Sequence, residues 1–221
     1  MSNTNPENNL TMSNGNFDFN AFVKESTDVL TKPDYFSTMK LSGGMTEPLI
    51  KAVIYGVIAG AFSFLWSILH LSFGGGLFGG AVGIMIFLST VIGAVVGLFI
   101  GAVLMLILSA ICGGSTDFEA NVRVAAALMV LMPINAFLKV FSGINFYLGL
   151  IVTIAVGLFG LWLAYKALVQ ALKAKPETSR IAVIVLGALL LITTLTGIGT
   201  SRRLSRMMND LNRPMQEMPK E

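Results

Sequence analysis

An uninterrupted apolar block from Leu77 to Cys112 contains no charged side chain. A helix rises about 1.5 Å per residue, so the block is longer than the roughly 20 residues that cross a bilayer. It is nevertheless too short for two complete spans and a turn. We therefore expect one long, tilted transmembrane helix over 83–111, with or without a half-helix in front of it.

The rest of the chain repeats this pattern. Hydrophobic residues make up 54% of the sequence and charged residues only 12%, against about 25% charged residues in a soluble domain. Four more apolar blocks are long enough to span: 49–71, 117–132 (with an extension after Pro133), 144–172 and 180–198. The sequence therefore predicts an all-α, polytopic membrane helix bundle of about five transmembrane helices.

Composition changes along the chain predict four regions. Residues 1–16 read as a disordered polar tail, and residues 17–45 as amphipathic juxtamembrane helices. Residues 46–200 form the five-helix transmembrane domain, and residues 201–221 a basic C-terminal tail.

Small residues recur at helical spacing in two of the expected spans. Gly93, Gly97 and Gly101 fall on every fourth position of the central block, and Gly56 and Gly60 form a GxxxG pair in the first. Glycines at this spacing leave a smooth strip where another helix approaches closely. We predict a helix-packing role for all five, within the chain or in a homo- or hetero-oligomer formed through the glycine-rich span.

Aromatic and basic residues mark the expected membrane interfaces. Pro33 opens a short helix that carries Tyr35 and Phe36. This helix either lies among the lipid headgroups or packs on the cytosolic ends of the spans, and the two interpretations are compatible. Trp162 and Lys166 form a similar interfacial cluster late in the fourth block. Lys51, near the start of the first span, is expected to snorkel to the interface.

The third span carries a charge unusually deep. Thr116 and Glu119 have the spacing of a capping box, which would start the helix at Asp117, and Pro133 should kink or end it. Arg123 lies about two turns inside. It either snorkels or pairs with Asp117 or Glu119, as a structural anchor or as a functional charge. In the fifth span, Thr178 or Ser179 is the predicted cap.

Reactive constellations are missing from the sequence. The chain has one His and one Cys, no metal-ligand spacing and no phosphate-binding loop. We predict that it is not an enzyme and that it uses neither a cofactor nor a metal. The net charge of +3 lies in short clusters beside apolar blocks, a pattern that suits lipid headgroups better than nucleic acid.

Several short segments resemble the Yip domain family (Ypt/Rab-interacting proteins), in its prokaryotic form. They are Leu30-Thr31-Lys32-Pro33-Asp34-Tyr35-Phe36 with Met39, Gly43-Gly44 and Pro48-Leu49; Gly113-Gly114, Phe118, Ala120, Arg123-Val124 and Pro133; and Trp162, Lys166-Ala167-Leu168 and Arg180-Ile181-Ala182. The resemblance implies a five-helix membrane domain with a cytoplasmic N-terminus. Its eukaryotic members are trafficking factors that associate with Rab-type GTPases and with each other. Their hallmark DLxGP-like motif has no counterpart here. That difference argues against GTPase binding.

Together these features favour a non-enzymatic integral membrane protein that organises membranes or serves as an interaction scaffold. A small transporter or channel, or a lipid-handling protein with a lateral groove, is the alternative. Loop charges favour a cytoplasmic N-terminus, because the first connection has no Lys or Arg and the fourth is basic. The expected location is a prokaryotic plasma membrane, or an endomembrane (ER or Golgi) if the source is eukaryotic.

Overall fold

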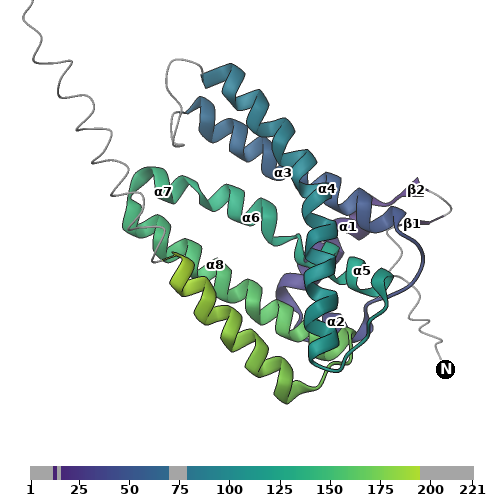
Figure 1. Cartoon of the computed structure of the whole chain (residues 1–221). Coiled ribbons are helices and arrows are strands. Elements are labelled where there is room, and N and C mark those ends of the chain that lie inside the picture. Colours follow the sequence, from purple (N-terminus) through teal and green to yellow (C-terminus); the bar gives the residue numbers. More distant parts are fainter. Residues whose placement is uncertain (1–11, 14–15, 70–78, 195–221) are drawn as a thin grey trace, which may run out of the picture. The chain divides into compact units, whose positions relative to one another are not determined.

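Five helices of the described chain are long and apolar enough to cross a membrane. The computed structural model describes residues 12–13, 16–69 and 79–194. The five candidate spans are Thr46–Ile68, Gly83–Ile111, Phe118–Ile144, Phe146–Ala171 and Pro176–Thr194. They confirm the predicted all-α membrane bundle (Figure 1). The chain divides into two compact units, Met1–Val183 and Ile184–Glu221, and the site described below lies within the first.

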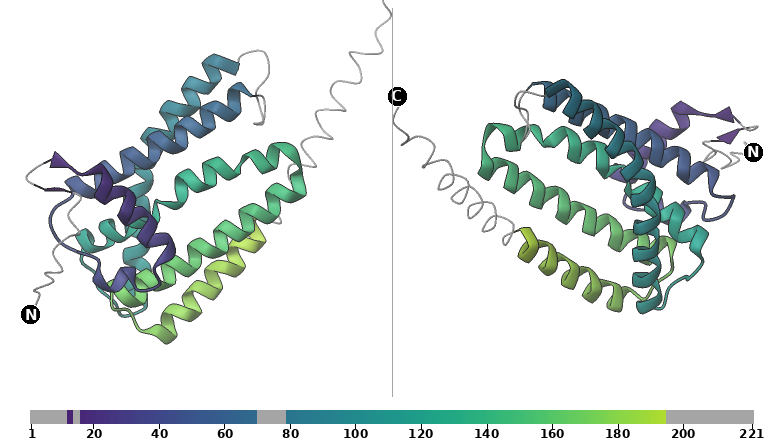
Figure 2. Two further views of the ribbon diagram at one scale, coloured as in Figure 1. Left: turned by 180° about the vertical axis from the view of Figure 1, so that it is seen from behind. Right: turned by 45° about the horizontal axis from the view of Figure 1, so that its top comes forward.

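Short elements precede the first span. Two-residue strands β1 (Met12–Ser13) and β2 (Asn16–Phe17) pair antiparallel, which the sequence did not predict. Helix α1 (Phe19–Thr31) begins after Asp18, whose carboxylate accepts hydrogen bonds from the next backbone N–H groups, and α2 (Tyr35–Thr38) follows Pro33. Figure 2 shows both helices at the end of the spans where α5 begins. The predicted disorder of 1–16 falls mostly outside the described residues.

The first two spans, α3 (Thr46–Ile68) and α4 (Gly79–Ile111), pack along each other at small residues. A Cβ atom added at Gly56 would lie 2.7 Å from the Cβ of Ala94, and one added at Gly60 would lie 2.8 Å from the ring of Phe87. Side chains at these two positions would force the helices apart, so the glycines set the close approach of α3 to α4.

Helix α4 has a packed face and a lipid-facing face. Ala94, Leu98 and Ala102 are fully buried, and the last two join a core cluster with Val122 of α5. Ile92 and Ile100, on another side of the helix, are more than half exposed. In a membrane these exposed apolar residues contact lipid, since acyl chains are as apolar as the side chains themselves.

The third span is broken. Helix α5 (Phe118–Leu128) is followed by a turn, then α6 (Leu131–Leu138) and the short α7 (Val140–Ile144). The span is interrupted as predicted, but at Met129–Val130 and not after Met132. Pro133 lies in the first turn of α6, where its missing N–H is tolerated. The predicted capping box was wrong. The cap is Asp117, whose carboxylate accepts from the Glu119 N–H, and the Glu119 side chain bonds elsewhere.

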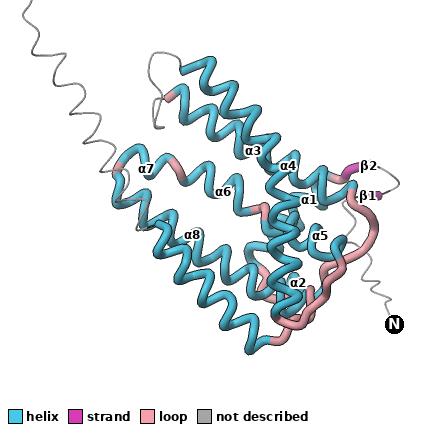
Figure 3. The backbone as a smooth tube through the Cα atoms, in the orientation of Figure 1, coloured by secondary structure: helices cyan, strands magenta, loops and turns pink. Residues whose placement is uncertain are grey.

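The fourth span combines α8 (Phe146–Lys166) with one turn of π-helix, η1 (Ala167–Ala171). The last described helix then begins at Pro176, so the predicted caps Thr178 and Ser179 lie inside its first turn and that prediction was wrong. Two turns at this end hydrogen-bond to each other. The Ser115 N–H donates to the Leu172 carbonyl at 2.7 Å, and the Lys175 N–H donates to the Cys112 carbonyl at 2.9 Å. Figure 3 shows loops (pink) concentrated near α2 and α5.

Candidate functional site

Charged residues far apart in the sequence meet where α1, α3 and α5 come together. Glu25 comes from α1, Glu47 and Lys51 from α3, and Glu119 and Arg123 from α5. We call these five residues the ionic cluster. Three carboxylates there face two cations, and the two cations are the most enclosed members. Lys51 is 5% exposed and Arg123 is 4% exposed.

Lys51 joins α3 to α1. Its ammonium lies 2.6 Å from a carboxylate oxygen of Glu25 and 2.7 Å from one of Glu47. The ammonium therefore pairs with carboxylates of α1 and of the first turn of α3, and whether it reaches the membrane interface stays a prediction. A buried ammonium with two carboxylate partners avoids the large cost of an unpaired buried charge.

Arg123 joins α5 to α3 and to the loop before it. Of the two predicted partners the structure shows Glu119, at 3.3 Å, together with Glu47 at 3.0 Å. The guanidinium also donates to the Gly44 carbonyl at 2.9 Å, and the Gly44 N–H donates to Glu119 at 2.6 Å. Gly44 has a φ of +91°, which side chains rarely adopt, so a glycine is needed where the loop folds over Arg123.

Aromatic residues pack around the ionic cluster. The Tyr35 hydroxyl donates to the Glu25 carboxylate at 2.5 Å, and the hydroxyl oxygens of Ser26 and Tyr55 are 2.8 Å apart. Burial raises the pKa of Tyr35 well above its ordinary value, and the adjacent Glu25 carboxylate raises this pKa further. Phe36 is only 2% exposed. The short helix α2 therefore packs on the ends of the spans, one of the two arrangements left open by the sequence.

The ionic cluster has the character of a clamp. Every charged member is held by at least one other, and the void beside it is only about 20 Å³, too small to admit a substrate. Its ion pairs and hydrogen bonds connect α1, α3, α5 and the loop at Gly44 to one another, which is a structural role.

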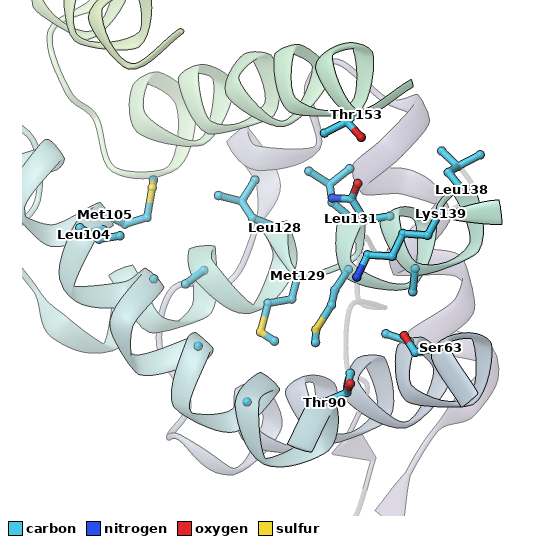
Figure 4. A pocket seen from close by; sticks show the side chains of 18 of the residues that line it. Ser63, Thr90, Leu104, Met105, Leu128, Met129, Leu131, Leu138, Lys139 and Thr153 are labelled. Atoms are coloured by element: carbon cyan, nitrogen blue, oxygen red, sulfur yellow. The ribbon is translucent and has the colours of Figure 1, made fainter. Parts of the chain in front are cut away.

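A second feature is a cavity of about 950 Å³ between α3, α4, α5, α6 and α8 (Figure 4). Gly93, Gly97 and Gly101 form part of its wall, and we call it the glycine-lined cavity. A Cβ atom added at Gly93 or Gly97 would have no described neighbour within 4 Å, and one added at Gly101 would lie 3.7 Å from the Cβ of Ala125. The strip thus faces open space along most of its length, where the sequence predicted a close helix contact.

The wall of the cavity changes character from one end to the other. Figure 4 shows Leu104 and Met105 at one end. Ser63, Thr90, Lys139 and Thr153 lie at the other end, with the Lys139 ammonium directed into the space. Among the described residues, Lys139 has no ion-pair partner.

The predicted interfacial residues lie in different environments. Pro33 is exposed, whereas Tyr35 and Phe36 belong to the core. Trp162 is 41% exposed, and the Lys166 ammonium lies 5.7 Å from the centre of its indole ring. As functional assignments, these residues, the five glycines and Arg123 stay predictions.

Sequence reasoning missed Glu25 and Glu47, two of the three carboxylates of the ionic cluster. Glu47 and Lys51 are four residues apart, as are Glu119 and Arg123, and this spacing is a recognised signal for ion pairs on a helix. The contact that joins the two helices, from Arg123 to Glu47, follows no sequence periodicity. Within the described residues no group of three or more His, Cys, Asp or Glu is placed to hold a metal ion. His70 and the glycines at 74–76 lie outside the described residues.

Comparison with known proteins adds one finding. A family model described as the Yip1 domain matches residues 27–198, which cover the last five residues of α1, all of α2 to α8 and the last described helix. No curated protein and no solved structure matched the chain.

Proposed function

The chain belongs to the Yip1 domain family of multi-span membrane proteins, and from this membership we propose that it is a non-enzymatic interaction scaffold. The observation that carries the proposal is the clamp formed by the ionic cluster. A catalytic group needs access to a substrate, yet the most concentrated charges of the described chain are buried and paired with one another. Their arrangement suits a structural role, in which the ion pairs hold one helix surface in a fixed position.

The surface that the clamp holds is the outer face of α1. Phe22 and Val29 are buried against the domain, while Phe19 is 59% exposed and Val23 is 45% exposed. Exposed apolar residues on a fixed helix at the membrane surface suit a protein partner, because little conformational entropy is lost on binding when the helix is already ordered.

Site-specific photo-crosslinking in cells tests this proposal. A photoreactive residue at Val23 should give a light-dependent adduct with a defined membrane or peripheral protein, identified by mass spectrometry. Breaking the clamp with Lys51→Met should reduce this adduct severalfold, because α1 loses its charged anchor to α3. A photoreactive residue at Leu65, exposed on α3, serves as the matched control. Adducts at Val23 that match those at Leu65, or that contain lipid alone, would refute a partner surface on α1.

We also propose a prokaryotic plasma membrane with the N-terminus in the cytoplasm, and therefore the ionic cluster on the cytoplasmic side. The proposal is supported by the basic residues at 173–175 and Arg180, which connect the fourth and fifth spans at the same end as the paired turns. Protease removal of an N-terminal tag from inverted vesicles, but not from intact cells, is the expected result. Cleavage from outside would reverse the assignment.

A further inference from the structure

The glycine-lined cavity has the size of a binding site. Its volume of about 950 Å³ lies at the upper end of the roughly 300–1,000 Å³ typical of small-molecule sites. The lining residues of α4 run from Thr90 to Leu108, which corresponds to about 27 Å of helix, close to the roughly 30 Å thickness of the bilayer core. An occupant that fills it is long and narrow.

The polar end of the cavity is formed by residues of four different spans. Ser63 lies near the end of α3 and Thr90 near the start of α4. Lys139 is near the end of the third span, and Thr153 is near the start of the fourth. Ser63 and Lys139 lie five residues before the ends of their spans, Thr153 lies seven residues after the start of its span, and Thr90 lies eleven residues after the start of α4. Four different spans thus place polar side chains at the same end of the cavity.

The Lys139 ammonium at the polar end of the cavity is available to an anionic group. Lys139 is exposed in a segment that crosses the membrane, and no described carboxylate pairs with it. Cations in such positions bind anionic groups, and basic pockets between transmembrane helices hold anionic headgroups. At the opposite end the wall is formed by Leu104, Met105 and Leu108, which suit an alkyl chain.

We propose that the glycine-lined cavity binds an anionic phospholipid, with its phosphate at Lys139 and an acyl chain along Gly97 and Gly101 toward Met105. The missing Cβ atoms at Gly93 and Gly97 leave the width that the chain occupies. Binding at this site is independent of the proposed scaffold role, because it involves a different end of the spans from the ionic cluster.

Native mass spectrometry of the purified full chain tests the proposal, with phosphatidylglycerol and phosphatidylcholine of identical acyl chains offered in equal amounts. The wild type should retain phosphatidylglycerol preferentially. Lys139→Gln should lower that preference about fivefold, the effect expected of one basic residue near a membrane surface. Lys166→Gln is the matched control, because Lys166 is also in a span but does not line the cavity, and it should leave the preference unchanged.

A second variant tests the place of the acyl chain. Gly97→Leu should fill the cavity and reduce retention of both lipids, while Val96→Leu, on an exposed face of the same helix, should not. Thermal unfolding of each variant shows whether it is folded. An unchanged lipid preference in Lys139→Gln, or full retention in a folded Gly97→Leu, would overturn the proposal. Loss of a wild-type dimer in Gly97→Leu with unchanged lipid retention would instead identify a second copy of the chain as the occupant.

Discussion

The cations at the two ends of the membrane domain lie in opposite environments, enclosed and paired at one end and exposed at the other. At the ionic cluster, Lys51 and Arg123 are almost fully enclosed and each contacts two carboxylates. At the glycine-lined cavity, Lys139 extends into open space without a described carboxylate beside it. The first end is closed by its own side chains, whereas the second, in the part of the chain that the structure describes, leaves a cation open to a ligand.

This difference separates the residues that hold the fold from those available to a ligand. A buried charge with full partners makes a stable joint, and removing one member leaves the others uncompensated. A charge that has no carboxylate beside it among the described residues is available to a ligand. Stability and lipid selectivity should therefore be sensitive to different substitutions, and the following variants test that separation.

The largest effect is expected for Arg123→Met. The change leaves Glu47, Glu119 and the Gly44 carbonyl without their common partner, so the free energy of unfolding should fall by about 3–5 kcal/mol. Reversible unfolding in mixed detergent micelles measures it. Lys24→Met, at an exposed position of α1, should stay within about 0.5 kcal/mol of the wild type. Equal losses in the free energy of unfolding of both variants would show that the ionic cluster contributes no more to stability than an exposed lysine does.

Gly56→Leu should rank next. Its new side chain meets Ala94 and the α4 backbone at Val91, so overpacking should lower the free energy of unfolding by about 1–3 kcal/mol. The same unfolding assay applies, with the exposed Val57→Leu on the same helix as control. A variant as stable as the control would mean that α3 and α4 separate at little cost.

Tyr35→Phe should cost about 1.5 kcal/mol at neutral pH, because a hydrogen bond to a charged carboxylate is lost. The folded state raises the pKa of Tyr35, so its neutral form is favoured by folding. This contribution is complete below pH of about 10, where the tyrosine of the unfolded chain is also neutral, and it declines at higher pH. Wild-type stability should therefore fall more steeply above pH 10 than that of Tyr35→Phe. Tyr147→Phe, with an exposed side chain, should follow the wild type.

The smallest effect is expected for Gly97→Ala. Its methyl group enters open space, so the free energy of unfolding should change by less than about 1 kcal/mol, mainly through helix propensity. Gly56→Ala, at the same motif spacing, should destabilise more because its methyl group would lie 2.7 Å from Ala94. Equal effects at the two positions would mean that both glycine pairs serve the same packing role.

Much of the fold was predictable from the sequence because each span is a long apolar block. The helix predicted over 83–111 ends at Ile111, as α4 does, although α4 begins four residues earlier at Gly79, and the third span is interrupted a few residues before Pro133. Helix starts were less predictable, since Asp117 and Thr116 are both good caps and only the path of the loop selects Asp117. The spacing of Gly93, Gly97 and Gly101 places them on one face, but nothing in that spacing tells whether the face meets a helix or a cavity.

The candidate site was predictable only in part. Arg123 stands out in any reading of the sequence as a charge deep in an apolar block. Its contact with Glu47 depends on how α3 and α5 are placed side by side, which no local pattern encodes. Lys139 is likewise visible in the sequence, yet its position beside Ser63 and Thr90 comes from the packing of three separate helices.

The hydrogen bonds between the paired turns bear on how the protein is made. During synthesis Cys112 and Ser115 leave the ribosome well before Leu172 and Lys175. The hydrogen bonds between the two turns can therefore form only after the fourth span has been synthesised. Chains truncated before Lys175 therefore lack a hydrogen-bond donor to the Cys112 carbonyl. Reporters fused to such truncated chains sample a biosynthetic intermediate, and topology is better mapped by insertions into the full-length protein.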